Sequence, residues 1–116
     1  MLLNLSNHPS SSWFESQIKA ATHQYQTVED LPFPQINPEW DDEQIEQLAE
    51  EYEIKIREIN PQAVHLMGEM TFTFKLVSRL KSIGIPCIAS TTERIATDDS
   101  NGNKTSVFQF VRFRAY

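Results

Sequence analysis

Short apolar segments alternate with segments of helical periodicity along this chain of 116 residues, and that alternation limits the fold more than any other feature. Met1 to Leu5 is an aliphatic run that ends before Pro9, which cannot donate a ladder hydrogen bond. Apolar residues then recur at helical spacing from Trp13 to Tyr25, and one of the serines at 10–12 is the expected N-cap. We expect strands at residues 1–5, 27–31, 63–67, 85–90 and 107–116, and further helices at 41–59 and 70–82.

The order of these elements, β-α-β-α-β-α-β-β, predicts a mainly parallel sheet with helices on both faces. The turn pair Asn101-Gly102 precedes the last strand and favours an antiparallel hairpin at the C-terminal edge. Gly84 is expected to end the third helix, in the usual manner of a helix-to-strand connection. The sequence therefore predicts an α/β fold, a Rossmann-like three-layer sandwich in which residues 1–116 form a single domain.

Charge is unevenly distributed along the chain. The totals are 10 basic and 16 acidic side chains, a net charge of -6. Residues 1–58 hold 3 basic and 12 acidic side chains, whereas residues 59–116 hold 7 and 4. The overall acidity argues against a protein that coats long DNA or RNA. The acidic face of the helix at 41–59, with Glu46, Glu50 and Glu53, is expected to be a solvated surface.

The sequence also argues against several other classes of protein. No apolar run approaches the roughly 20 residues of a membrane span, and the first ten residues lack the features of a secretory signal. The chain has one cysteine, Cys87, which excludes a disulfide scaffold. Its three glycines form neither a dinucleotide fingerprint nor a phosphate-binding loop with its lysine, so no cofactor is expected. The expected location is the cytoplasm.

Three segments follow the carboxyl ends of predicted parallel strands, where ligands bind in open α/β sheets. They are Ser6–Ser10, Gly68–Thr71 and Ser90–Arg94. Gly68 would allow close approach of the backbone, and the helix that begins at Met70 would direct free N–H groups at an anion. Thr71, Thr91 and Thr92 add hydroxyls, and Arg94 adds a guanidinium fork for phosphate. Serine and threonine at such places also cap helices and turns, and that reading stays open.

The ionisable side chains differ in what they predict. His8 could be a general acid, a phosphate contact or a simple loop residue, whereas His65 lies within a strand and is expected to be a hydrogen-bonded core or interface histidine. Glu69 could be a general base, a hydroxyl anchor or a stabiliser of the helix N-terminus. Cys87 is expected to pack in the core. The three histidines have no metal-binding spacing, so no metal site is predicted.

The last strand alternates aromatic and basic residues. Arg112 and Arg114 should share one face, with Phe113 on the other. Basic residues interleaved with aromatics suit nucleotide phosphates and bases. The alternative is an edge strand protected by its charges.

Three segments together resemble the small Csx-type CRISPR-associated accessory proteins of type III systems. They are Asn4-Leu5-Ser6-Asn7-His8, the Gly68-Glu69 turn with the later Ala89-Ser90-Thr91-Thr92-Glu93-Arg94, and the closing Val111-Arg112-Phe113-Arg114-x-Tyr116. The resemblance spans nearly the whole chain. It implies a CARF-like domain that works as a homodimer on cyclic oligoadenylate, with cyclic tetra-adenylate as the expected ring. It also implies a ring nuclease of antiviral defence that needs no metal.

The resemblance also implies roles for the candidate residues. Ser6, Asn7 and His8 would line the ring, and Gly68 and the helix start would hold phosphate. Glu69 and Thr71 would belong to the ligand-binding residues. Thr91, Thr92 and Arg94 would contact phosphate or ribose. A ribose 2′-hydroxyl would attack the adjacent phosphorus, with Arg94 stabilising the charge and His8 protonating the leaving oxygen.

Two other functions remain open at this stage. One is a sensor or sponge that binds the cyclic nucleotide without cutting it. The other is an interaction module that docks a partner through the acidic helix at 41–59.

Overall fold

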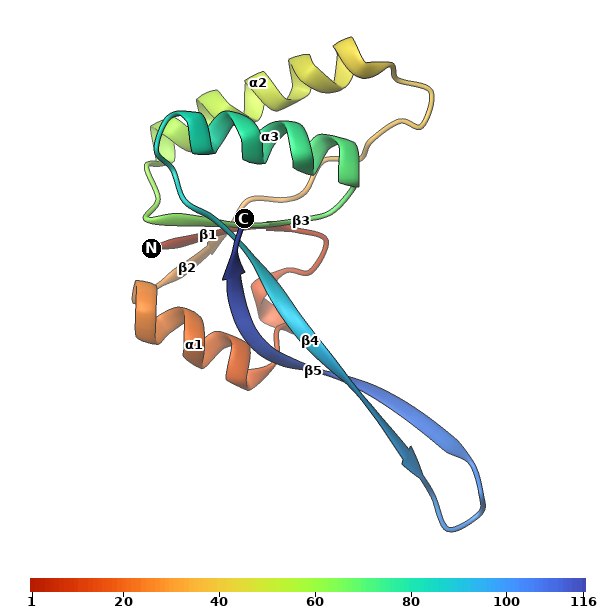
Figure 1. Ribbon diagram of the computed structural model, residues 1–116. Helices are drawn as coiled ribbons and strands as arrows, with labels where there is room; N and C mark the ends of the chain where they lie inside the picture. Colours follow the sequence, from red (N-terminus) through yellow and green to blue (C-terminus); the bar gives the residue numbers. More distant parts are fainter.

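The computed structural model describes all residues, 1–116, as one five-stranded sheet with helices on both faces (Figure 1). The strand order is β2-β1-β3-β4-β5, in which β1 to β4 run parallel and β5 pairs antiparallel with β4. The predicted α/β class, element order and antiparallel edge are therefore confirmed. The elements are β1 (Leu2–Ser6), a short 3-10 turn (Ser10–Ser12), α1 (Glu15–Tyr25), β2 (Val28–Asp30), α2 (Asp42–Ile59), β3 (Ala63–Met67), α3 (Met70–Ser82), β4 (Cys87–Asp98) and β5 (Lys104–Ala115).

Each face of the sheet has its own core because neighbouring residues of a strand point to opposite faces. Leu3 and Leu5 of β1 pack with residues of α2 and α3, among them Phe72 and Leu76. Leu2 packs on the other side, in the cluster that includes Trp13, Ala21 and Tyr25. Figure 1 shows α2 and α3 together over one face and α1 beneath the other. Every side chain of the inner strand β1 is consequently buried.

The connections explain where the chain reverses its direction across the sheet. From β1 the chain moves to one side, through α1 to β2, and then returns through α2 to β3 on the other side of β1. Parallel crossovers are almost always right-handed, which requires α1 and α2 to lie on opposite faces. The loops after β1 and β3 therefore leave the sheet in opposite directions and open a crevice at their carboxyl ends.

The strands β4 and β5 continue beyond the sheet as a two-stranded arm, which lengthens the molecule to 52 Å (Figure 1). The pairing register shifts between Thr91 and Thr92, because Arg112 pairs with Thr91 while Phe110 pairs with Thr92. Val111 is thus the extra residue of a β-bulge. The bulge turns Phe110 to the same side as Phe113, and their ring centroids lie 5.0 Å apart.

Several predicted boundaries are wrong, among them the start of β5, which is Lys104 rather than residue 107. The segment Ser90–Arg94 is not a loop, because β4 runs through it to Asp98 and its backbone pairs with β5. The first helix begins only at Glu15 and has no serine cap, since Ser10–Ser12 form the separate 3-10 turn. In contrast, β3 and α3 have the predicted bounds, and α2 begins one residue after the predicted start, behind the capping residue Asp41.

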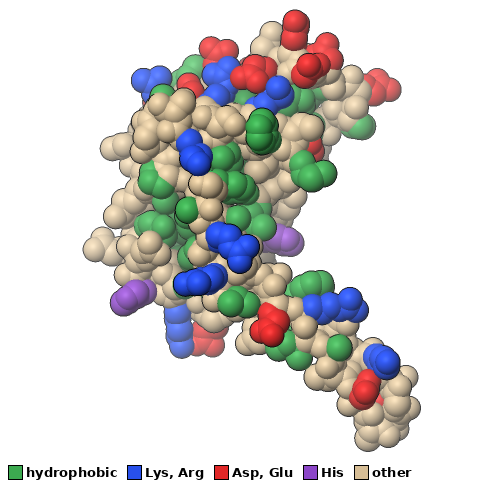
Figure 2. Space-filling model, viewed as in Figure 1, with side chains coloured by type: hydrophobic (Ala, Val, Ile, Leu, Met, Phe, Trp, Pro, Cys, Tyr) green, Lys and Arg blue, Asp and Glu red, His purple; other side chains and the backbone are tan.

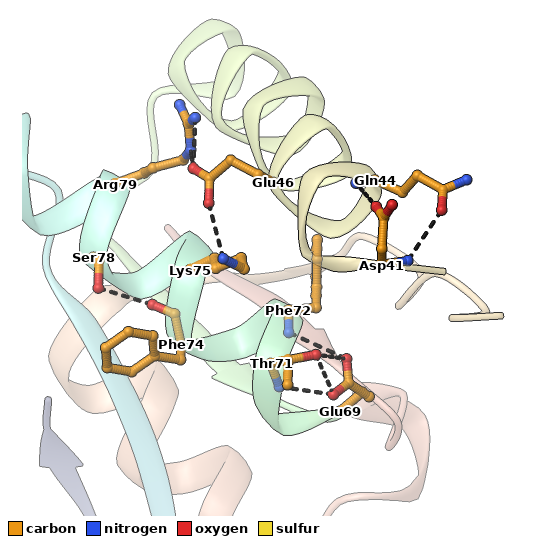
Figure 3. Close-up of polar contacts among 10 residues, drawn as sticks. All are labelled: Asp41, Gln44, Glu46, Glu69, Thr71, Phe72, Phe74, Lys75, Ser78 and Arg79. Carbon is orange, nitrogen blue, oxygen red and sulfur yellow. Dashed lines mark hydrogen bonds and ion pairs between the residues drawn. The ribbon is translucent and has the colours of Figure 1, made fainter. Parts of the chain in front are cut away.

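The acidic face of α2 is only partly a solvated surface. Acidic side chains gather at the end of the molecule where α2 lies (Figure 2), but Glu46 points toward α3. Its carboxylate lies 2.7 Å from Arg79 Nη2 and 3.3 Å from Lys75 Nζ (Figure 3). The hydrogen bond from Arg79 is the largest cause that holds the pKa of Glu46 below its usual value. None of the helices combines the length and the apolar character needed to cross a membrane.

Candidate functional site

A polar residue interrupts each of the apolar strands β1, β3 and β4 on the face that α1 covers. They are Asn4, His65 and Ser90. Asn4 and His65 are direct partners in the parallel pairing of β1 with β3, and His65 pairs with Ile88, two residues before Ser90. Because side chains alternate along a strand, the three side chains point to the same face and can reach one another.

These three side chains form a continuous chain of hydrogen bonds. His65 Nε2 lies 2.7 Å from Ser90 Oγ, and His65 Nδ1 lies 2.9 Å from Asn4 Oδ1. The amide of Asn4 donates to two acceptors, the backbone carbonyl of His8 and the carboxylate of Asp30, each at 2.8 Å. Asn4 Oδ1 is therefore an acceptor, so His65 carries its proton on Nδ1. His65 Nε2 is left to accept the hydrogen bond from the Ser90 hydroxyl.

Two further residues complete the network at its ends. Gln17 of α1 donates from Nε2 to Ser90 Oγ at 3.0 Å. Asp30 at the end of β2 accepts from Asn4 and from the backbone and hydroxyl of Ser10. Burial raises the pKa of Asp30, but these hydrogen bonds outweigh it and leave the pKa below its usual value. An ionised Asp30 thus holds Asn4 in the orientation that His65 requires.

His65 is 1% exposed, and the expectation that it is a hydrogen-bonded core histidine is confirmed. Burial disfavours its charged form, and the nearby His8 adds a smaller effect of the same sign, so the pKa of His65 falls to about 4. The ring of Trp13 packs against it, edge to face, at a centroid distance of 4.9 Å. At neutral pH the imidazole is uncharged and able to accept a proton.

Above this network lies a pocket of about 430 Å³, which we call the aromatic pocket. Its polar lining comes from the strands β1, β3 and β4 and from the loop after β1, with Ser6, His8, His65, Ser90 and Thr92. Its aromatic lining consists of Trp13, Phe14, Phe108 and Phe110. A concave apolar site with a few convergent polar groups is typical of small-molecule pockets.

The loop that carries His8 is fixed by its backbone. The carbonyl oxygen of His8 accepts from Asn4 Nδ2 at 2.8 Å, from Ser6 Oγ at 3.0 Å and from Trp13 Nε1 at 3.0 Å. Its N–H donates to Ser6 Oγ at 3.2 Å. The imidazole itself is exposed at the edge of the aromatic pocket. Ser6 therefore positions His8 as well as lining the pocket.

A second pocket, of about 770 Å³, lies on the other side of Ser6. We call it the proline-loop pocket because Pro32 and Pro34 of the loop after β2 line it. Asn7 and Glu69 line this pocket rather than the aromatic one. The predicted site residues are thus divided: Ser6, His8 and Thr92 line the aromatic pocket, while Asn7 and Glu69 lie with Ser6 in the proline-loop pocket.

The start of α3 does not present free N–H groups to an anion. Glu69 caps the helix, and its carboxylate accepts from the backbone N–H of Thr71 at 2.7 Å and of Phe72 at 3.1 Å (Figure 3). The hydroxyl of Thr71 donates to the same carboxylate at 2.6 Å. Of the three roles open for Glu69, its contacts are those of the helix stabiliser. The α-carbon of Gly68 is covered by the ring of Phe33.

Arg94 and Thr91 lie outside both pockets. Arg94 is on the arm, exposed, and donates to the hydroxyl of Ser106 at 2.9 Å from Nη2 and 3.1 Å from Nε. Thr91 is on the opposite face of β4 from Ser90 and Thr92, and its hydroxyl donates to the carbonyl of Arg112. The structure of the single chain brings His8 and Thr92 together in one pocket but does not bring Arg94 to them.

His65 was predicted to be a core or interface histidine, and no role was predicted for Asn4, Gln17 or Ser90. The sequence does carry a signal, because Asn4, His65 and Ser90 are polar residues within otherwise apolar parts of β1, β3 and β4. What the sequence did not supply is the pairing register, which puts those residues in contact. No three His, Cys, Asp or Glu side chains lie close enough together to hold a metal ion.

A search of curated proteins and a search of solved structures found no match. The family model described as "Uncharacterized protein MJ1673 family" matches residues 1–114, which include every residue of both pockets. The chain belongs to the MJ1673 family.

Proposed function

We propose that this protein binds a cyclic oligoadenylate, with cyclic tetra-adenylate as the expected ring, and cleaves it without a metal ion. The aromatic pocket is the observation that carries the proposal, because it joins aromatic side chains, hydroxyls and histidines beside the crevice of the parallel strands. Aromatic rings suit adenine, and the hydroxyls suit ribose and phosphate oxygens. The likeness of three sequence segments to CRISPR-associated Csx-type proteins supports the same choice of ligand.

The strand order and the position of the crevice also support a Rossmann-like, CARF-like classification for the domain. A pocket of about 430 Å³ suits one nucleotide unit rather than a whole ring. A homodimer would supply two such pockets to a ring with matching symmetry. Because Arg94 lies on the protruding arm, its proposed role in stabilising phosphate charge requires the arm to reach a pocket of the partner subunit.

The reaction consists of one internal displacement. The 2′-oxygen of a ribose attacks the adjacent phosphorus, the bond from phosphorus to the 5′-oxygen breaks, and a 2′,3′-cyclic phosphate remains on the linear product. His8 donates the proton that the leaving 5′-oxygen takes up. Positioning of the two oxygens in line supplies the rest of the acceleration.

The test is to incubate the protein with cyclic tetra-adenylate in the presence of a chelator and to separate the products by chromatography. We expect linear products ending in a 2′,3′-cyclic phosphate. His8→Ala and Arg94→Ala should each slow cleavage by about 100-fold, whereas His23→Ala, on the exposed surface of α1, should not. Wild-type rates in both site variants would overturn the mechanism, and an intact ring after prolonged incubation with wild type would overturn cleavage.

A second candidate, binding without cleavage, is favoured by one observation: neither Lys nor Arg lines the aromatic pocket of the single chain. A sensor or sponge would return the ring intact while its melting temperature rises with ligand concentration. If no cyclic oligoadenylate changes the melting temperature, the interaction module based on residues 41–59 becomes the better proposal.

A further inference from the structure

We infer that Ser90, backed by His65 and Asn4, is the group that accepts the proton of the attacking ribose hydroxyl. This inference rests on the proposed function, which assigns a proton donor and a charge-stabilising residue but no proton acceptor. Ser90 is the catalytic residue of this group because its hydroxyl lines the aromatic pocket. His65 takes up the proton from Ser90, and Asn4 is a positioning residue.

The geometry is that of an activated hydroxyl. A base whose ring nitrogen lies within hydrogen-bond distance of a hydroxyl, and whose other nitrogen is held by a third group, is the recurring arrangement for this purpose. Here the distances are 2.7 Å from Ser90 Oγ to His65 Nε2 and 2.9 Å from His65 Nδ1 to Asn4 Oδ1. The third residue is itself fixed, since both hydrogens of its amide are donated to Asp30 and to His8.

The direction of each hydrogen bond follows from the donors and acceptors present. Gln17 donates to Ser90 Oγ, and Ser90 donates its only proton to His65. One lone pair of the Ser90 oxygen remains, and it is free to accept from a ribose hydroxyl in the pocket. A chain of this kind moves a proton inward from the pocket without exposing His65, which is 1% accessible.

Burial and, to a smaller extent, the nearby His8 favour the neutral form of His65 before the reaction. The titratable groups on this side of the sheet are His8, in the loop after β1, and Asp30 on β2, which is hydrogen-bonded to Asn4. Trp13 of the loop before α1 and Phe113 of β5 pack against the imidazole, and Gln17 of α1 contacts Ser90. These three side chains carry no charge. The pKa of about 4 leaves His65 unprotonated at neutral pH, as a proton acceptor must be.

The proton transfers balance with the displacement. The ribose 2′-hydroxyl gives its proton to Ser90 Oγ as the 2′-oxygen bonds to phosphorus, and Ser90 gives its own proton to His65 Nε2. His65 becomes an imidazolium whose Nδ1–H donates to Asn4, while the leaving 5′-oxygen takes a proton from His8. After product release, His65 returns the proton through Ser90 to water or to His8.

The test compares steady-state cleavage of cyclic tetra-adenylate by wild type and by Ser90→Ala, Ser78→Ala and Asn4→Asp. Ser78 of α3 is the matched control because its exposed hydroxyl lies outside the aromatic pocket and donates to the carbonyl of Phe74. We expect Ser90→Ala to lower kcat by about 100-fold with KM changed less than about threefold. Ser78→Ala should retain wild-type kcat.

The pH profile adds a result that a structural role would not produce. Activity of wild type should fall as pH drops through the pKa of His65, near 4, because protonation removes the acceptor. In Asn4→Asp the carboxylate beside Nδ1–H favours the imidazolium, so the acid limb of kcat/KM should move to higher pH. Melting temperatures of both variants show whether they are folded.

The outcomes separate the two proposals. If wild type does not cleave the ring, the proposed cleavage fails and this inference fails with it. If wild type cleaves but Ser90→Ala keeps its kcat, or Asn4→Asp keeps the wild-type acid limb, only the inference is overturned.

Discussion

The α-carbon of Gly68 lies so close to Phe33 that a side chain does not fit between them. A Cβ atom at this position would lie 2.2 Å from the nearest ring atom of Phe33, whose ring packs edge to face on Phe72. We expect Gly68→Ala to lower the free energy of unfolding by about 1–3 kcal/mol, because Phe33 must leave its place. Urea denaturation measures the change.

A double-mutant cycle identifies the cause of that loss. In a Phe33→Ala background, where the ring is gone, Gly68→Ala should cost much less. An equal cost in both backgrounds would mean that the glycine is required for another reason than its contact with Phe33.

Burial of Cys87 predicts a low chemical reactivity of its thiol. Its side chain lies in the core beside β3, as predicted, and burial raises the pKa of its thiol to about 11. The reactive thiolate is therefore almost absent at neutral pH. An aromatic disulfide reagent at pH 7 should label the native protein hundreds of times more slowly than the urea-unfolded chain; rapid labelling of the native protein would contradict this placement.

At the scale of the element, Glu69 links the turn after β3 to the stability of α3. Slight burial raises the pKa of its carboxyl, but the hydrogen bonds from Thr71 and Phe72 lower it by more. We expect Glu69→Ala to lower the free energy of unfolding by about 1 kcal/mol at pH 7. Glu50→Ala, at an exposed position on α2, is the matched control and should change it little.

The effect of Glu69 should also depend on pH. Its pKa is lower in the folded than in the unfolded chain, so its stabilisation is complete above the usual value of 4.5 and is lost as pH falls through the folded value. The stabilities of wild type and Glu69→Ala should therefore converge below pH 4.5. A difference that stays constant down to pH 2.5 would show that the carboxylate charge is not responsible.

The interiors of the elements could be predicted from the sequence, but some of their ends could not. The bounds of α3 follow from local signals, namely the turn at Gly68-Glu69 and the glycine at 84. The end of β4 depends on a partner distant in sequence, because Ser90–Arg94 is extended only through pairing with β5. These polar residues, whose sequence favours a loop, therefore form a strand because of their tertiary pairing with β5.

The same distinction applies to the candidate site. The crevice at the carboxyl ends of the strands follows from the order of the elements, and His8 and Ser6 were predicted there. The contact of His65 with Asn4 and Ser90 depends on strand register, which no local pattern fixes. Arg94 was expected at the crevice because Ser90–Arg94 was predicted to be a loop after the strand at 85–90, whereas the strand continues outward on the arm.

At the scale of the whole molecule, the arm formed by β4 and β5 is the least supported part of the fold. Its outer residues, such as Ile95 and Val107, are exposed, although a two-stranded ribbon alone is only marginally stable. We expect backbone amides of the outer arm to exchange hydrogen at least 100-fold faster than those of β3 in dilute solution.

The proposed homodimer predicts that hydrogen exchange in the arm depends on protein concentration. If a second copy covers the apolar side chains of the arm, exchange should slow as the protein concentration rises, while exchange in β3 should stay the same. Rapid exchange at every concentration up to millimolar would contradict a dimer in which the arm takes part.

The bulge at Val111 has a consequence for how the end of the chain tolerates change. Side chains along β5 point alternately to the two faces of the strand. The extra residue of the bulge shifts this alternation by one between Phe110 and Phe113. A substitution at Val111, which is exposed, leaves this alternation unchanged. Removal of the residue would reverse the alternation on one side of it, so that Phe110 and Phe113 would no longer point to the same face of β5. At this position the number of residues matters more than their identity.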